Sequence, residues 1–438
     1  MKASNYNFFF PYKEDNSKLI AYNSFSNALA LMDRQQHSIF KNYCDNSIEI
    51  EDEEFFQNLK SNGFLIGDSF NEKDMLRLRL LSSRYSTKYL GLTIAPTADC
   101  NFRCPYCYEK DALCPLYMGE EVQDKIIELV KQQANNLSFL SITWYGGEPL
   151  LALNTIKKLS KEFLTICEEY NIKYSANIVT NGYLLTRKNI ETLNELKITS
   201  MQVTLDGSKE IHNNMRPLAN GLGTFDIILD NLTSNIDILP MTSIRVNVDK
   251  NNITSAKEVI ELLREKELLD KLKPYLGRIT PDNGTYDCSR CFDVCGFSNE
   301  EFSYYKEVFG EDDNFLIRYP SPVSNVCTAD CMNSFIISAD GKLYKCWVDI
   351  GNDDKVTGSL LDVVNSNTDL YLQYLLHDPT LDEKCINCKL LPICMGGCPY
   401  KRVRNEETCT TYKYMLKDYI SHISEKIKLN KKECVSNK

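Results

Sequence analysis

Cysteine is the residue type with the clearest chemical pattern in this sequence. The chain has 438 residues and 18 cysteines, and most of them stand in close groups. The first group is the C-x3-C-x2-C run of Cys100, Cys104 and Cys107, with Tyr106 before its last cysteine. Three thiolates on so short a loop can hold three irons of a [4Fe-4S] cluster and leave the fourth iron open to a small molecule. A structural zinc site is the alternative, but it needs four ligands and no fourth lies within easy reach.

Further cysteines cluster between positions 288 and 409, and they fall into three groups. The groups are Cys288, Cys291 and Cys295; Cys327, Cys331 and Cys346; and Cys385, Cys388, Cys394, Cys398 and Cys409. Zinc knuckles also contain C-x2-C pairs, so zinc is again the alternative ligand. Only Cys44, Cys114, Cys167 and Cys434 stand alone, and we expect these to be ordinary thiols.

Composition and charge narrow the class of protein. The sequence is 43% hydrophobic and 25% charged, which is typical of a globular chain. Its formal net charge of −10 argues against general binding of nucleic acid. No apolar run approaches the length of a membrane span, and the first residues lack the apolar region of a signal peptide. We therefore expect a cytoplasmic protein without disulfides.

The middle of the sequence alternates between predicted strands and predicted helices. The predicted strands are Leu90–Ala95, Leu140–Trp144, Tyr174–Thr180, Ser200–Leu205, Ser243–Val248 and Tyr275–Ile279. The predicted helices are Glu120–Ala134, Thr155–Tyr170, Arg187–Leu196, Thr224–Ser234 and Ser255–Leu269. This alternation predicts an α/β fold, a partial (β/α)6 barrel of parallel strands over residues 89–280. In such folds the chemistry takes place at the carboxyl ends of the strands, where the first cysteine group lies.

The segments on either side of this barrel have other patterns. Residues 1–88 predict a small module, with strands at Asn7–Tyr12 and Leu19–Asn23 and helices at Asp33–Tyr43, Asp52–Asn62 and Asn71–Tyr85. Its order of elements resembles a winged-helix fold; a simple extension of the barrel is the alternative. Residues 281–410 are irregular and rich in cysteine, and residues 411–438 predict a helix over Thr411–Leu429 with a Lys-rich tail.

The barrel segment resembles the radical SAM superfamily. The resemblance rests on the first cysteine group and on three motifs at later strand ends, followed by one arginine. They are Gly146-Gly147-Glu148, Thr180-Asn181-Gly182, Thr204-Leu205-Asp206-Gly207 and Arg216. The resemblance implies that the three cysteines hold a [4Fe-4S] cluster and that its open iron binds S-adenosylmethionine (SAM). It also implies SAM contacts from Gly146, Gly147, Glu148, Asn181, Thr204 and Arg216.

The implied chemistry is reductive cleavage of SAM to methionine and a 5′-deoxyadenosyl radical, which abstracts hydrogen from an unactivated C–H bond. The cofactor carries this step, and the protein positions and shields it. The sequence leaves open which side chain, if any, acts as a further catalytic group.

Residues 327–410 resemble the SPASM domain that follows many radical SAM cores. The cysteine order from Cys331 onward, C-x9-G-x4-C, C-x2-C-x5-C-x3-C and a final C, carries this resemblance. It implies two auxiliary [4Fe-4S] clusters. The first would be held by Cys327, Cys331, Cys346 and Cys398, and the second by Cys385, Cys388, Cys394 and Cys409. Cys327 lies outside the motif; without it the first auxiliary cluster would have an open iron. The group of Cys288, Cys291 and Cys295 is outside the pattern, and a metal site, a thiol near the substrate and a structural role all remain open.

Two subclasses of this family fit the sequence. Peptide maturases crosslink a short ribosomal precursor, and anaerobic sulfatase-maturating enzymes oxidise Cys or Ser to formylglycine. The latter carry an Asp after the cysteine of the G-x4-C segment, whereas this chain has Trp347 after Cys346. They also lack an N-terminal module like residues 1–88. We therefore expect a peptide maturase that binds a leader peptide through this module by strand addition and receives electrons from a flavodoxin- or ferredoxin-type donor. Thioether formation is the first expectation and a carbon–carbon crosslink the second.

A non-enzymatic iron–sulfur protein is the remaining alternative, either an electron carrier or a redox-sensing DNA-binding protein. The predicted winged helix is acidic, with Asp45, Glu49, Glu51, Asp52, Glu53 and Glu54 close together. Such a surface repels the phosphate backbone. The motifs that would bind SAM would also serve no purpose in such a protein.

Overall fold

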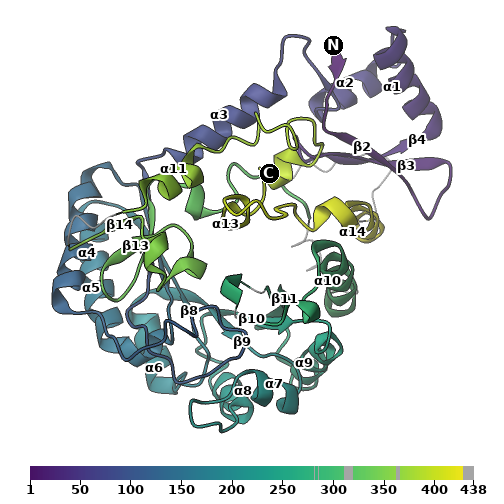
Figure 1. The fold of residues 1–438 in the computed structure, drawn as a ribbon. Coiled ribbons are helices and arrows are strands. Elements are labelled where there is room, and N and C mark those ends of the chain that lie inside the picture. Colours follow the sequence, from purple (N-terminus) through teal and green to yellow (C-terminus); the bar gives the residue numbers. More distant parts are fainter. Residues whose placement is uncertain (281, 285, 310–318, 362–365, 428–438) are drawn as a thin grey trace. The chain divides into compact units, whose positions relative to one another are not determined.

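The computed structural model describes the chain except residues 281, 285, 310–318, 362–365 and 428–438. Cys434, the Lys-rich tail and the end of the last predicted helix lie outside the described residues, and so does the side chain of Cys288. The chain forms two compact units (Figure 1). One contains residues 1–84, 294–327 and the part from 377 onward, and the other contains residues 85–293 and 328–376. The cysteine-rich segment 281–410 thus contributes to both units.

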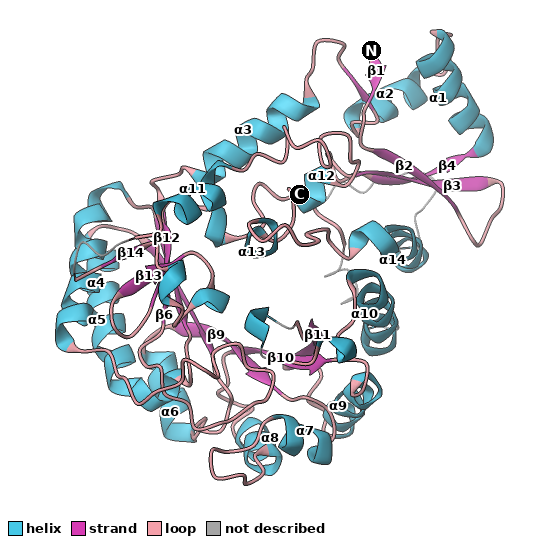
Figure 2. Cartoon of the chain, viewed as in Figure 1, coloured by secondary structure: helices cyan, strands magenta, loops and turns pink. Residues whose placement is uncertain are grey.

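A nine-stranded sheet forms the centre of the unit that contains residues 85–293 (Figure 2). Its strand order is β11-β10-β9-β8-β7-β6-β12-β13-β14. Six successive parallel strands make up most of it: β6 (Tyr89–Ile94), β7 (Phe139–Trp144), β8 (Lys173–Val179), β9 (Ile198–Thr204), β10 (Met241–Val248) and β11 (Leu272–Arg278). Each coincides with a strand predicted from the sequence, so the predicted α/β class and its six parallel strands are confirmed.

Helices connect these parallel strands. They are α4 (Glu120–Gln133), α5 (Leu153–Glu169), α6 (Arg187–Glu195), α7 (Lys209–Met215), α8 (Phe225–Ser234) and α9 (Ile253–Glu265). All except the short α7 were predicted. The unit also contains α11 (Thr368–Leu376).

The two faces of the parallel sheet differ in polarity. Leu90, Leu92 and Ile94 of β6 are at most 1% exposed, and alternate residues of the neighbouring strands are likewise apolar and buried. On the opposite face, polar side chains follow one another across β9 and β10, where Thr204 and Arg245 are direct neighbours in register. Because side chains alternate along a strand, this polar face is continuous. It faces the candidate site described below.

Three short strands extend the sheet beyond β6 and were not predicted. β12 (Ser334–Ile337) pairs in parallel with β6, and β13 (Lys342–Tyr344) and β14 (Gly358–Ser359) follow in antiparallel order. These strands have four residues or fewer, too few for an alternating pattern to stand out in a cysteine-rich segment.

The N-terminal residues form the predicted small module within the other unit. Its three-stranded antiparallel sheet has the order β2 (Asn7–Pro11), β3 (Lys18–Asn23) and β4 (Leu29–Asp33), and β1 (Lys2–Ala3) pairs with β5 (Leu65–Ile66). The helices are α1 (Arg34–Asn46), α2 (Glu53–Ser61) and α3 (Glu72–Arg84), and the side chains of Asp33 and Asp52 cap the first two. β4 was missed because its Ala, Leu and Met residues favour a helix.

The same unit contains four more helices from later in the chain: α10 (Val294–Phe309), α12 (Leu391–Cys394), α13 (Pro399–Arg402) and α14 (Tyr412–Ile427). Leu76 and Leu80 of α3 form one apolar cluster with Tyr6, Leu391 and Met395. The N-terminal module has a core of its own, formed by buried apolar residues between Ala21 and Leu65, and α3 packs in addition against the C-terminal cysteine segment. In the described part of the chain, no helix is long and apolar enough to span a membrane.

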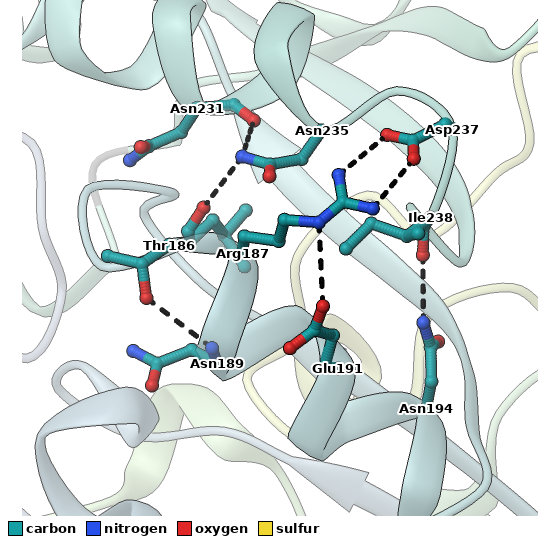
Figure 3. A network of polar contacts seen from close by, with 10 residues as sticks. Thr186, Arg187, Asn189, Glu191, Asn194, Asn231, Asn235, Asp237 and Ile238 are labelled. Carbon is teal, nitrogen blue, oxygen red and sulfur yellow. Dashed lines mark hydrogen bonds and ion pairs between the residues drawn. The ribbon is translucent and has the colours of Figure 1, made fainter.

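A network of polar contacts ties α8 to the loop that follows β8 (Figure 3). The Asn231 amide donates to the carbonyl oxygens of Gly182 at 3.0 Å and Tyr183 at 2.9 Å. Arg187, the first residue of α6, makes a bidentate ion pair with Asp237 at 3.1 and 2.9 Å. The loop after β8, which carries Thr180-Asn181-Gly182, is thereby anchored from its outer side.

We expect the two parts of this network to differ in strength. Replacing Asn231 by Ala removes one hydrogen bond from each of two partly buried carbonyl oxygens, of which Gly182 O still accepts from Leu185 N at 3.3 Å. The loss should cost about 1–3 kcal/mol of stability. Asp237→Asn weakens an ion pair whose two side chains are 52% and 56% exposed, so its cost should be clearly smaller, because solvent screens exposed charges. Urea unfolding followed by circular dichroism measures both. Equal losses in the two variants would contradict the proposed anchoring role of Asn231.

Candidate functional site

The first cysteine group lies on a loop after β6 that is held by another loop of the same unit. Arg103 N donates to Pro217 O at 2.9 Å, and Ala219 N donates to Asn101 O at 2.8 Å. Phe102 between them is 1% exposed. The residues directly after Arg216 therefore hold the cysteine loop through main-chain hydrogen bonds. Two motifs that are far apart in the sequence are in contact here.

The thiols of Cys100, Cys104 and Cys107 all line one cavity. Burial raises the pKa of Cys100 to about 12, and the negative charges of Glu148 and Cys104 add to this effect. Burial likewise raises the pKa of Cys104 and of Cys107, and the charges of Cys104 and Cys100 contribute for Cys107. These three thiols are only partly exposed, and with their pKa values raised they require a positive partner to become thiolates. Iron supplies that charge, so the donor set fits the predicted cluster.

The two glycines after β7 allow close contact with this loop. Gly146 has a φ of +94°, a backbone conformation that favours glycine. A Cβ atom on Gly147 would lie 2.1 Å from the carbonyl oxygen of Asp99, the residue before Cys100. Glu148 N donates to this same oxygen at 2.8 Å. The glycine pair is therefore required, in part, for packing against the cysteine loop.

Glu148 is fully buried and acts as an acceptor for the backbone of two loops. Its carboxylate accepts hydrogen bonds from Leu150 N at 3.0 Å, Thr180 Oγ1 at 2.8 Å and Asn181 N at 2.7 Å. It thus joins the ends of β7 and β8. It is not among the residues that line the cavity, and its predicted contact with SAM stays a prediction.

Arg216 belongs to a buried polar network at the ends of β9 and β10. Its Nη1 donates to the Tyr106 hydroxyl at 2.6 Å, and this hydroxyl donates to the Asp206 carboxylate. Asn247 Nδ2 also donates to the Tyr106 hydroxyl, at 3.2 Å, and Asn247 N donates to Asp206 at 2.8 Å. The guanidinium is therefore fixed beside the cysteine loop, with one carboxylate near it.

His212 contacts this network through Asp206 and through the Thr224 hydroxyl. Its Nδ1 accepts from Asp206 N at 3.1 Å, and its Nε2 lies 3.1 Å from the Thr224 hydroxyl, which donates to Arg216 O at 2.7 Å. Burial lowers the pKa of His212 to about 3, and the charge of Arg216 adds to this effect. The ring is therefore neutral at physiological pH, and its role is structural.

The cavity itself has a volume of about 310 Å³. Most of the residues expected to bind the cluster or SAM line it: Cys100, Cys104, Cys107, Gly146, Gly147, Asn181, Thr204 and Arg216. The structure thus brings together motifs that are spread over more than a hundred positions. Their individual roles stay predictions.

Further lining residues had not been singled out from the sequence as site residues. They are chiefly Glu109, Gln202, Arg245, Asn247 and Arg278, and Trp347 lies beside them. Burial raises the pKa of Glu109 to about 8. Arg245 and Asn247 alternate with apolar residues in β10. That alternation was a usable signal, because polar side chains on one face of an otherwise apolar parallel strand point into the barrel.

The candidate auxiliary ligands divide between the two units. In the unit with the N-terminal module, burial raises the pKa of Cys385 to about 11, and the charges of Asp382, Cys394, Cys388 and Cys409 add to the effect. Three of these charges belong to the other thiols of the second predicted set. Among the described residues, however, no group of three or more Cys, His, Asp or Glu side chains is arranged to hold a metal ion, so this set stays a prediction. Lys413 Nζ donates to Cys409 Sγ at 3.4 Å.

The loop between Cys394 and Cys398 packs closely against the main chain of Thr408. Met395, Gly396 and Gly397 all have positive φ, and a Cβ atom on Gly397 would lie 1.7 Å from Thr408 O. This contact brings the residue before Cys409 against the loop. Cys331 and Cys346 belong to the other unit, whereas Cys327 and Cys398 belong to this one. The first auxiliary set, which combines them, stays a prediction.

Comparisons with known proteins agree with this site. The model of the Radical SAM superfamily matches residues 94–263. A cysteine-type anaerobic sulfatase-maturating enzyme of Clostridium perfringens is 26% identical over 365 residues, which cover 75% of this chain and 94% of that protein.

Two solved structures share the fold. The structure of anSMEcpe with bound AdoMet and Kp18Cys peptide has a TM-score of 0.60 and 22% identity, and the match covers 77% of this chain and 99% of that chain. The structure of Streptococcus suis SuiB bound to precursor peptide SuiA has a TM-score of 0.54 and 16% identity, with 94% and 98% covered. The family match and the loop of three thiols show that residues 94–263 contain a radical SAM domain, and the two solved structures share the fold of the chain.

Proposed function

We propose that this radical SAM enzyme modifies a ribosomal precursor peptide by installing an intramolecular crosslink. Cys100, Cys104 and Cys107 would hold the [4Fe-4S] cluster that radical SAM enzymes bind, and the adjoining cavity would hold SAM. When bound, the cluster and SAM supply a 5′-deoxyadenosyl radical. Arg216 would bind the SAM carboxylate, because a guanidinium matches a carboxylate bidentately and is permanently charged. Gly146, Gly147, Asn181 and Thr204 would contact the remainder of SAM.

The two auxiliary clusters are part of the same proposal. Cys385, Cys388, Cys394 and Cys409 would hold one, and the effect of the other three thiolate charges on the pKa of Cys385 supports the assignment. Cys327, Cys331, Cys346 and Cys398 would hold the other. A flavodoxin- or ferredoxin-type protein would supply the electrons, and we place the enzyme in the cytoplasm.

The observation that carries peptide recognition is the free edge of β4 in the N-terminal module. Just beyond the paired strands, Asn23 N donates to Ala28 O at 2.9 Å. Hydrogen-bonded pairs recur at every second residue of an antiparallel ladder, so Ala21 and Ala30, which are register partners, form the next bonded pair. The N–H and C=O of Leu31 then point away from β3, toward the free edge, where an extended peptide can add as a further strand.

The opposite edge of the same sheet is less suited to this role. Pro11 of β2 has no N–H to donate. The carbonyl oxygen of Asn7 already accepts a hydrogen bond from Lys389 Nζ at 3.0 Å. We therefore place the leader peptide on β4.

The crosslink is supported by the residue that follows Cys346. Trp347 lines the cavity and stacks on Tyr145, with ring centroids 5.0 Å apart. An indole cannot accept a proton as the Asp of sulfatase-maturating enzymes would. The fold of SuiB, which matches 94% of this chain, also includes more of it than the 77% matched by anSMEcpe. A thioether is the first expectation and a carbon–carbon bond the second.

Formylglycine formation is the second candidate function. The similarity to the Clostridium perfringens sulfatase-maturating enzyme, over 94% of its length, favours it. Trp347 in place of the Asp argues against it.

Product analysis tests the proposed function. The enzyme is co-expressed anaerobically with each short reading frame that neighbours its gene, and the peptides are analysed by mass spectrometry. A thioether removes two hydrogens and one iodoacetamide-reactive thiol, whereas a carbon–carbon crosslink removes two hydrogens and leaves every thiol reactive. A product with a hydrazide-reactive aldehyde and no crosslink would replace the proposal by formylglycine formation.

Cluster loading on the first cysteine group is tested by Cys104→Ala. This variant leaves only two thiols in the loop, so reductive cleavage of SAM should fall below detection. Chromatography of 5′-deoxyadenosine after addition of dithionite provides the measurement. Cys114→Ala removes an exposed lone thiol and serves as the control, with unchanged cleavage. Continued SAM cleavage by Cys104→Ala would refute the role of this loop.

Leu31→Pro tests the docking edge. Proline removes the outward N–H of β4 while the pairing with β3 is kept, since proline is tolerated on edge strands. We expect about tenfold weaker binding of the fluorescently labelled precursor, from the lost hydrogen bond and the obstructing ring. SAM cleavage without peptide should stay unchanged. Leu31→Ala, which keeps the N–H, should bind within about threefold of the wild type. Wild-type affinity in Leu31→Pro would move the docking site elsewhere.

A further inference from the structure

Arg245 is a cavity-lining arginine whose guanidinium group uses few of its hydrogen-bond donors. It lies in β10, beside Thr204 of β9 and Tyr275 of β11 in register, and it lines the same cavity as the cysteine loop. Its Nε donates to Asn247 Oδ1 at 2.6 Å. Among the residues that the structure describes, its Nη1 and Nη2 atoms have no hydrogen-bond partner, and no carboxylate forms an ion pair with it. A partly buried permanent charge of this kind favours an anionic ligand.

The carboxylate of Asp206 does not serve as the missing partner. Asp206 accepts hydrogen bonds from the Tyr106 hydroxyl and from Asn247 N. Burial raises the pKa of Asp206, and the charge of Arg216, these hydrogen bonds and the charge of Arg245 oppose this effect. Arg245 therefore acts on Asp206 only through space, and its two Nη atoms remain available for a ligand.

The strand next to Arg245 leaves room for its guanidinium group. Arg245 Cζ lies 5.9 Å from the centre of the Tyr275 ring. A Cβ atom on Gly277, two residues further along β11, would lie 2.5 Å from Arg245 Nε and 2.6 Å from Nη2. The guanidinium thus occupies the space that a side chain at position 277 would fill, while Asn247 holds its Nε.

Arg245 and Arg216 occupy different parts of the cavity wall. Arg216 Cζ lies 5.6 Å from the centre of the Phe102 ring in the cysteine loop, whereas Arg245 lies over Tyr275 of β11. In the proposed function, Arg216 binds the carboxylate of SAM. SAM has only one carboxylate, and its ammonium and sulfonium groups are positive, so it offers no second anion. The charge of Arg245 is therefore available to the other reactant, the peptide.

We propose that Arg245 binds a carboxylate group of the peptide substrate and so holds the peptide inside the cavity. The inference rests on the proposed function and adds the chemical class of the group that the peptide presents. An Asp or Glu side chain near the modified residue and the C-terminus of the peptide offer the same chemistry, since each presents two oxygens to Nη1 and Nη2. All the residues that carry the inference lie within one unit of the structure.

Synthetic tripeptides separate carboxylate binding from catalysis and identify its source. Acetyl-Gly-Glu-Gly-amide has only a side-chain carboxylate, acetyl-Gly-Gly-Gly has only a C-terminal one, and acetyl-Gly-Gln-Gly-amide has none. Isothermal titration calorimetry measures their binding to the reconstituted full chain in the presence of SAM. At least one of the two carboxylate peptides should bind about tenfold more tightly than the neutral peptide. Equal affinities for all three would overturn the proposal, even if no variant of Arg245 can be purified.

Two substitutions test the residue itself. Arg245→Gln removes the charge and the paired Nη donors, so it should abolish the preference for a carboxylate. Gly277→Ala keeps the charge but places a methyl group in the space of the guanidinium, so it should weaken the preference. Arg187→Gln is the matched control, because it removes one arginine charge from the same unit at a site where Asp237 is the partner. A preference that persists in Arg245→Gln as in Arg187→Gln would overturn the proposal.

SAM affinity and product analysis complete the test. Arg245→Gln should bind SAM as the wild type does. A loss of SAM affinity with an unchanged carboxylate preference would assign Arg245 to SAM and overturn the proposal. Absence of a crosslinked product together with an Arg245-dependent preference would instead refute the proposed function and leave the carboxylate site in place, so the two failures are distinguishable.

Discussion

The active centre depends on three cysteine side chains that line one cavity and resist ionisation. Partial burial raises the pKa of all three thiols, and the charge of a neighbouring thiolate adds to this effect for Cys100 and Cys107. A cationic cluster turns this repulsion into attraction. The loop must therefore be held in place by contacts that do not involve the thiols. The main-chain hydrogen bonds of Pro217 and Ala219 and the close contact between Gly147 and Asp99 hold the loop through main-chain atoms alone.

The two faces of the parallel sheet differ in polarity, and the polar face lines the cavity. Its outer face is apolar and packs on the helices, while its inner face carries amide and guanidinium groups toward the cavity. Buried polar groups are stable only when they are satisfied. Tyr106, Asp206 and Asn247 are joined by hydrogen bonds, and the Tyr106 hydroxyl accepts one from Arg216 Nη1, so the guanidinium keeps its orientation before any ligand arrives. Such preorganisation reduces the cost of ordering the site when SAM binds. Arg216 Nε is buried and has no hydrogen-bond partner among the described residues.

The repeating part of the fold and the cysteine loop could be predicted from the sequence. Strands β6 to β11 and their helices have strong periodicity, and three close thiols have few chemical uses. The short strands β12 to β14 escaped because four residues carry no period. The role of Glu148 as an acceptor for Leu150, Thr180 and Asn181 escaped because a motif shows which residues stand near a cofactor, not which atoms they face. Arg245 and Arg278 needed the register of neighbouring strands before they could be placed in the cavity.

The apolar cluster that joins α3 to residues 391–395 has a consequence for biosynthesis. Tyr6, Leu76 and Leu80 leave the ribosome first, but Leu391 and Met395 follow more than three hundred residues later. The core between Ala21 and Leu65 can form as soon as the first module is translated, whereas Leu76 and Leu80 of α3 lack their apolar partners until the last cysteine segment is made. During synthesis these two leucines are therefore a surface that chaperones can bind.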